Sequence, residues 1–158
     1  MSISVLVVLA AVAVNGLLAG ASLDQSVKQL PARKRIGVAA YSAYAQAADL
    51  ANGIPLYAGL GIGAAVLSVM AALVGWCDGH EAAQLPAALA ITLALLHSAA
   101  TTQAAQTMFG QRRALGDEAA LARLFDRFAR WQAYRCALQL ANFGALLWLW
   151  ASVTAPTL

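Results

Sequence analysis

The sequence has few charged residues. They make up 11% of its 158 positions, whereas a soluble domain usually carries about 25%. Hydrophobic residues account for 61% of the chain, and the mean hydropathy is +0.69. This balance argues against an ordinary soluble domain. It predicts an integral membrane protein that forms one domain over residues 1–158.

Cysteine is also scarce. Cys77 and Cys136 fall in different apolar runs, and we expect them to lie toward opposite faces of the membrane, too far apart for a disulfide. There is no Cys-x-x-Cys motif or Cys/His cluster that would indicate structural zinc. His97 is the one histidine within an apolar run, so paired-histidine haem ligation is disfavoured. We therefore expect neither a metal nor a cofactor.

Positive charge is missing from the start of the chain, because no Lys or Arg precedes Lys28. A secretory signal peptide begins with a basic region and has a shorter apolar run than residues 1–22. The sequence therefore predicts a retained first membrane helix.

Long hydrophobic runs are abundant. A bilayer-spanning helix needs about 20 apolar residues, whereas membrane β-strands are shorter and alternate in polarity. The predicted fold is an all-α, four-transmembrane-helix bundle with cytoplasmic helical extensions at 23–53 and 110–130. The predicted spans are residues 3–22, 54–76, 85–109 and 131–153.

The basic residues predict the orientation. All but Arg135 fall in the two predicted extensions: Lys28, Arg33, Lys34, Arg35, Arg112, Arg113, Arg123, Arg127 and Arg130. Cytoplasmic loops carry such an excess, so both extensions are placed in the cytoplasm of an inner-membrane protein, with both termini outside. The basic residues lack the interleaved aromatics of a nucleic-acid site, and contact with anionic lipid headgroups is the preferred interpretation.

The extensions are expected to be helical. Gly53 and Pro55 suggest a break before the second span, so residues 35–53 form either an interfacial helix or the lower half of one long kinked helix. Asp117 and Glu118 are typical of a helix N-terminus, and the helix that begins there is expected to run into the fourth span.

Polar residues within spans often mark function, because a charge at the bilayer centre costs about 2.5–3.5 kcal/mol. Trp131, Arg135, Gln139 and Asn142 are spaced by 4, 4 and 3, which places them on one helical face. The alternative for Arg135 is snorkelling to lipid phosphate. Gln139 and Asn142 continue the stripe and favour an inward face.

The other candidates come from the first three spans and the segment before the second. They are Asn15, Tyr41, Asp49, Asn52, His97 and Thr101. His97 could equally be a neutral histidine hydrogen-bonded between helices, and Asp49 could be solvated or paired with an arginine. Most of these polar residues fall at the midplane or in the predicted cytoplasmic half. A polar floor with apolar walls predicts a pocket for a flat, lipophilic molecule with a polar end.

The stretches GLLAGASLDQSVKQLPARKR (16–35), NGIPLY (52–57) and RFARWQAYRCALQL (127–140) carry a resemblance. The chain resembles the anthrone oxygenase-like family of small four-span membrane proteins, much of which is a domain of unknown function. The resemblance covers the whole layout. It implies a cofactor-independent oxygenase that oxidises an anthrone-like molecule to a quinone with O₂. The Trp-x-x-x-Arg element of the family falls on Trp131 and Arg135, and its polar position in the second span falls on Asn52.

Such chemistry needs a base and a group that stabilises an oxyanion. We assign the base to neutral His97, with Asp49 as its rival, and the oxyanion stabiliser to Arg135. Substrate-binding residues would be Asn15, Tyr41, Asn52, Thr101, Trp131, Gln139 and Asn142. His97 matches no catalytic residue of the family.

Two other functions stay open. One is a non-catalytic protein that binds a lipid or quinone, and the other is an accessory protein whose polar residues only join helices. The expected partners are a lipophilic small molecule or lipid and the bilayer, with no nucleic acid. A homo-oligomer is an alternative, for which Gly16 and Gly20 form a candidate contact, although packing inside the bundle is favoured.

Overall fold

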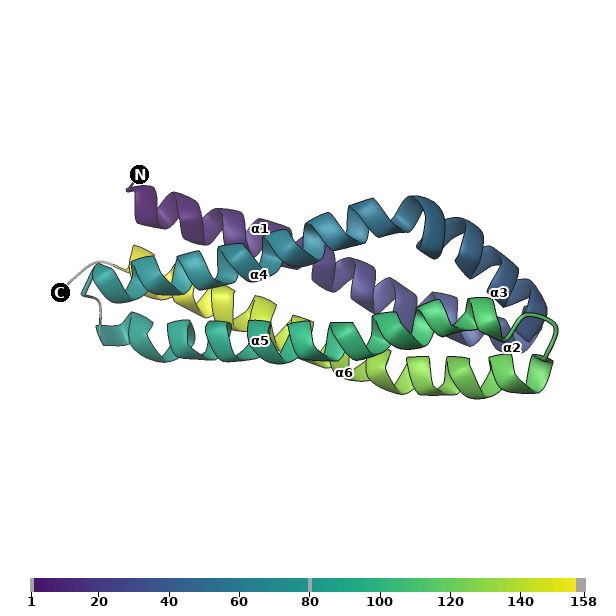
Figure 1. Ribbon diagram of the computed structural model, residues 1–158. Helices are drawn as coiled ribbons and strands as arrows, with labels where there is room; N and C mark the ends of the chain where they lie inside the picture. Colours follow the sequence, from purple (N-terminus) through teal and green to yellow (C-terminus); the bar gives the residue numbers. More distant parts are fainter. Residues whose placement is uncertain (1, 80, 156–158) are drawn as a thin grey trace.

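The computed structural model describes residues 2–79 and 81–155, and every regular element in these residues is helical. Four long helical rods form an antiparallel bundle in which both termini lie at one end (Figure 1). All four are long and apolar enough to cross a membrane, which confirms the prediction of an integral membrane protein with four helices. The rods run over Ile3–Ile36, Val38–Cys77, Glu81–Arg113 and Glu118–Thr154.

The first rod contains an irregular turn. It consists of α1 (Ile3–Asp24), the π-helical segment η1 (Gln25–Gln29) and α2 (Leu30–Ile36). The backbone N–H of Leu30 donates to the carbonyl of Gln25, five residues earlier. Pro31 follows directly. A proline ring displaces the carbonyl four residues before it, here that of Val27, and the wider π turn gives this carbonyl room.

The second rod also contains a π turn shortly before a proline, Pro55. Gly37, with φ of +85°, makes the tight turn into α3 (Val38–Ala47), which continues through η2 (Ala48–Asn52) into α4 (Gly53–Cys77). At Gly53 and Pro55 the chain stays helical. The N–H of Gly53 donates to the carbonyl of Ala48, and the helix bends without stopping. Of the two alternatives for residues 35–53, the long kinked helix is observed from Val38 onward, whereas residues 35 and 36 end the first rod.

The last two rods pack against each other along most of their length. They are α5 (Glu81–Gly110), which ends in the 3₁₀ turn η3 (Gln111–Arg113), and α6 (Glu118–Thr154). Asp117 caps α6 by accepting a 2.9 Å hydrogen bond from the N–H of Ala120. The predicted start of this helix and its continuous run into the fourth span are both confirmed.

The bundle has two cores. The one near the termini is rich in alanine and is closed by Leu146 and Leu149 of α6. The other lies at the opposite end and contains Tyr41, Phe125 and Phe128. We call this opposite end, which carries Lys34, Arg35, Arg112 and Arg113, the basic end. Large apolar side chains cover the outer surface of the bundle, as expected for a protein surrounded by lipid.

The two glycines of the candidate oligomer contact, Gly16 and Gly20, have different surroundings. A Cβ on Gly16 would lie 3.0 Å from the Phe143 ring of α6, so Gly16 serves packing inside the bundle, as favoured. Nothing lies within 4 Å of a Cβ added to Gly20.

The two cysteines are free, Cys77 exposed and Cys136 buried.

Candidate functional site

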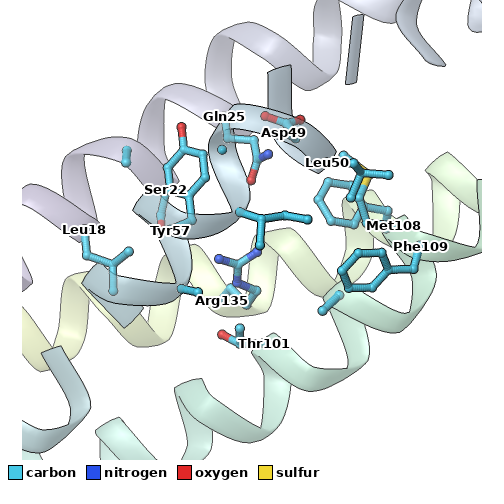
Figure 2. A pocket seen from close by; sticks show the side chains of 16 residues that line it. Leu18, Ser22, Gln25, Asp49, Leu50, Tyr57, Thr101, Met108, Phe109 and Arg135 are labelled. Atoms are coloured by element: carbon cyan, nitrogen blue, oxygen red, sulfur yellow. The ribbon is translucent and has the colours of Figure 1, made fainter. Parts of the chain in front are cut away.

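A cavity of about 260 Å³ lies between the four rods, beside both π turns. η1 contributes Gln25 to its wall, and η2 contributes Asp49 and Leu50. α5 adds Thr101, and α6 adds Arg135 (Figure 2). The cavity therefore forms where the first two rods depart from regular α-helix.

Arg135 lies in the middle of the lining residues, with Asp49 and Gln25 on one side and Thr101 on the other (Figure 2). Its Nη1 donates to the side-chain oxygen of Gln132 at 2.9 Å. Its Nε is buried and has no hydrogen-bond partner. Neither ion pair among the described residues includes Arg135. Arg135 thus lines the cavity with one unpartnered N–H group and without a compensating carboxylate.

Gln132 fixes Arg135 in this position. Its amide nitrogen donates to the carbonyl of Ser22 at 3.1 Å and to the hydroxyl of Ser26 at 3.3 Å. These bonds tie α6 to the end of α1 and orient the amide oxygen toward the guanidinium. Arg135 is therefore held from the first rod.

Asp49 approaches the cavity from η2. The residue is half-buried, and its Oδ2 is buried without a hydrogen-bond partner. Arg135 and Asp49 therefore lie on different walls of the cavity, and each carries one buried polar atom without a hydrogen-bond partner. A buried polar group without a partner is costly, so either side chain gains by turning that atom toward a polar ligand.

The rest of the wall is mostly apolar. Leu18, Met108 and Phe128 line the interior. Tyr57 of α4 and Phe109 of α5 also line the cavity, and they are 39% and 46% exposed. The cavity therefore reaches the apolar outer surface of the bundle at these two side chains.

A second group of polar residues is a closed hydrogen-bond cluster, which we call the Asn15 cluster. It joins Asn15 of α1, Ser68 of α4, and Gln139 and Asn142 of α6, all at most 1% exposed. The side-chain oxygen of Asn15 accepts from Gln139 at 3.0 Å and from Asn142 at 2.9 Å. Its amide donates to Ser68 at 3.2 Å and to the carbonyl of Ala11 at 2.9 Å.

The Asn15 cluster uses up most of its own polar atoms and does not line the cavity. Three predicted binding residues, Asn15, Gln139 and Asn142, therefore come together, but they face one another. Their contacts match the alternative in which polar residues join helices.

His97 occupies a position in the buried face of α5 that is otherwise mostly alanine, and it does not line the cavity. Its Nε2 is buried without a partner, so no hydrogen bond from that atom joins it to another helix. Thr101, one turn later, donates its hydroxyl to the carbonyl of His97 at 2.8 Å. Among residues 2–79 and 81–155, no three His, Cys, Asp or Glu side chains are grouped to hold a metal ion.

The remaining predicted binding residues lie away from the cavity wall. Tyr41 is buried at the basic end, with its ring edge-on to Phe125 at a centroid distance of 5.0 Å. Asn52 is exposed. Trp131 is half-buried beside Tyr134, with a centroid distance of 5.9 Å.

The sequence interpretation missed several residues that shape this region. Gln25 fell in the predicted cytoplasmic extension and was not a candidate, although its spacing from Leu18 and Ser22 places all three on one helical face. Gln132 belongs to the stretch 127–140. The inward face inferred for the fourth span was drawn through Trp131 and Arg135, and it did not include Gln132. Ser68 gave little signal, because serine in an apolar span often bonds its own backbone.

Comparison with protein-family models, curated proteins and solved structures gave no match.

Proposed function

We propose that the cavity binds a compact lipophilic molecule with an aromatic or quinone-like ring and oxidises it with O₂, as the anthrone oxygenase-like resemblance implies. The observation that carries this proposal is the presence of Arg135 and Asp49 in one mostly apolar cavity, each with a buried polar atom that has no hydrogen-bond partner. Pockets for small molecules are roughly 300–1,000 Å³. A volume of about 260 Å³ suits a few fused rings better than a phospholipid.

Arg135 binds the oxygen of the ligand. A guanidinium in a site of low dielectric stabilises a developing oxyanion strongly, because water does not screen the charge. Gln132 already holds Nη1, so the guanidinium needs little reorganisation when the ligand binds. The apolar wall formed by Leu18, Met108 and Phe128 packs against the rings.

Asp49 is the base in this proposal, in place of His97, because it lines the cavity and His97 does not. Its carboxylate takes a proton from the ring carbon of the anthrone. The electron pair left behind gives an enolate whose oxygen lies at Arg135. The enolate transfers electrons to O₂. Overall the ring CH₂ becomes a carbonyl, one oxygen atom enters the product, and the other leaves as water with both hydrogens.

A non-catalytic binding protein is the second candidate. The Asn15 cluster favours it, because three of the polar residues expected to bind substrate are used in contacts between helices. Binding needs Arg135 and the apolar wall, but it does not need a base. In either case we propose that the basic end faces the cytoplasm of an inner-membrane protein and that both termini lie outside.

The test uses the full chain in lipid nanodiscs with anthrone as the probe. Anthrone binding is measured by fluorescence, and turnover is measured by O₂ consumption and anthraquinone formation against protein-free discs. Asp49→Asn should keep binding and lower turnover by about 100-fold or more. Arg135→Gln should weaken both. Asp24→Asn is the matched control, because Asp24 is a carboxylate on the same end of the bundle that bonds Lys28 and Gln29 outside the cavity.

The outcomes separate the two candidates. Binding of anthrone without turnover, with equal affinity in Asp49→Asn and the wild type, would identify a binding protein. If anthrone fails to bind, or if Arg135→Gln leaves its affinity unchanged, the cavity does not have the proposed function.

A further inference from the structure

A second hollow lies at the basic end, between the last turns of α5 and the first half of α6. It measures about 370 Å³ and shares no residue with the Arg135 cavity. Arg123, Arg127 and Arg130 form one side. Their spacing of four and three residues places all three on one face of α6. Inferences about this groove are therefore independent of the oxygenase proposal.

The floor of the groove is a close contact between the two helices. A Cβ on Gly110 would lie 3.0 Å from Cδ1 of Leu124, so α5 and α6 can approach closely because residue 110 is a glycine. Gln106 and Thr107 of α5 complete the lining. The hydroxyl of Thr107 donates to the carbonyl of Gln103 at 2.9 Å. The groove thus has an apolar floor and a rim that is mainly basic.

The three arginines have no carboxylate partners in the part of the chain that the structure describes. The two ion pairs among the described residues join Lys28 to Asp24 and Arg33 to Asp126. Asp126, the acidic residue on α6 nearest in sequence to these arginines, is thus engaged by the first rod. Three guanidinium groups along one groove repel one another, and an anion between them removes that repulsion. Planar guanidinium groups bind phosphate oxygens with paired hydrogen bonds.

We propose that this groove binds the phosphate headgroup of an anionic phospholipid from the leaflet that meets the basic end. The position of the groove, near aromatic residues typical of the membrane interface, argues for a lipid. Arg130 is followed directly by Trp131, and Tyr134 one turn later is 63% exposed, as is typical of aromatic residues at a membrane interface. Basic pockets between membrane helices at this depth suit anionic headgroups.

The acyl chains also have a place to lie. Phe109 precedes Gly110 on α5 and is 46% exposed. A phosphate in the groove would leave the chains of its lipid beside this apolar surface. A free phosphate ion would use only the arginines.

The experiment titrates detergent-solubilised full-length protein with dioctanoyl phosphatidylglycerol, dioctanoyl phosphatidylcholine and glycerol 3-phosphate, and follows binding by native mass spectrometry. Arg127→Gln and the double variant R123Q/R127Q remove charge from the groove. Arg35→Gln is the matched control, because it removes one exposed arginine at the same end of the bundle but outside the groove. Circular dichroism during thermal unfolding checks that each variant folds.

We expect phosphatidylglycerol to bind more tightly than phosphatidylcholine. Arg127→Gln should weaken its binding by about tenfold, because a charge-assisted hydrogen bond is lost, and the double variant should weaken it further. Arg35→Gln should change it by less than about twofold. Equal losses in Arg127→Gln and Arg35→Gln would overturn the proposal in favour of diffuse attraction. Glycerol 3-phosphate binding as tightly as the lipid would overturn the lipid source.

Discussion

Replacing Asn15 by alanine tests whether the Asn15 cluster holds the bundle together. In the wild type, the Asn15 side chain makes four hydrogen bonds to other helices: it donates to Ser68 and to the carbonyl of Ala64, and it accepts from Gln139 and Asn142. Hydrogen bonds between membrane helices average about 0.6 kcal/mol each, so losing four should cost about 2.4 kcal/mol of unfolding free energy.

The assay is reversible unfolding of the full chain in lipid–detergent bicelles with increasing sodium dodecyl sulfate, followed by tryptophan fluorescence. Ser98→Ala is the control, since Ser98 donates only to the carbonyl of Ala94 in its own helix. It should change stability by less than about 0.5 kcal/mol. A double-mutant cycle of Asn15→Ala with Asn142→Ala should show a favourable coupling of at least about 0.6 kcal/mol.

The same variant separates a structural role from a binding role. Because the Asn15 cluster does not line the Arg135 cavity, Asn15→Ala should leave anthrone affinity unchanged under conditions where the protein stays folded. The reasoning is refuted if Asn15→Ala lies within about 0.5 kcal/mol of the wild type, or if it abolishes binding without lowering stability.

Three further results are expected. Asp117→Ala should destabilise the protein by about 1 kcal/mol in the same unfolding assay through loss of the α6 cap, and an unchanged midpoint would contradict this. Gly75→Leu should lower stability by about 1–3 kcal/mol, because even a Cβ there would lie 2.9 Å from Cδ1 of Leu149; a neutral effect would show that the helices separate easily. In intact cells, a membrane-impermeant maleimide should label exposed Cys77 and spare buried Cys136, and labelling of Cys77 only after permeabilisation would refute the proposed orientation.

The sequence was sufficient for the large features of the fold. Four apolar runs predicted four long helices, because a bilayer leaves few other ways to satisfy backbone hydrogen bonds. Asp117 marked the start of α6, because an aspartate side chain caps free N–H groups at a helix N-terminus. These signals are local, or they depend on composition, so they can be read without knowing the neighbouring helices.

The phase of α6 could not be predicted in the same way. Spacings of 4, 4 and 3 place Trp131, Arg135, Gln139 and Asn142 on one face. Gln139 and Asn142 are buried as expected, but in the two preceding turns the buried residues are Gln132 and Cys136, one position after Trp131 and Arg135. A helical face is broad enough to include both sets, and packing against α1 selects between them. Trp131 therefore lies at the edge of the interface, beside Tyr134.

The site was predicted only in part for a related reason. Arg135, Asp49 and Thr101 do line one cavity, whereas His97 and Asn15 do not. Polarity within an apolar span indicates that a residue seeks a partner, but it does not say whether that partner is another helix or a ligand. Pro55 indicated an irregular backbone. Whether the helix breaks or widens there depends on what packs against it.

The two π turns change the helical register. Each acts like one additional residue inserted in an otherwise regular helix, which rotates everything beyond it by about 100° relative to an uninterrupted α-helix. Removing a single residue from η2 would therefore carry all of α3 to a different face and redirect Tyr41 and Ser42 away from their present partners. Related chains that are one residue shorter at 25–29 or 48–52 would thus have a regular helix there and would lack this cavity. This would hold even if all their other differences from the present sequence were conservative substitutions.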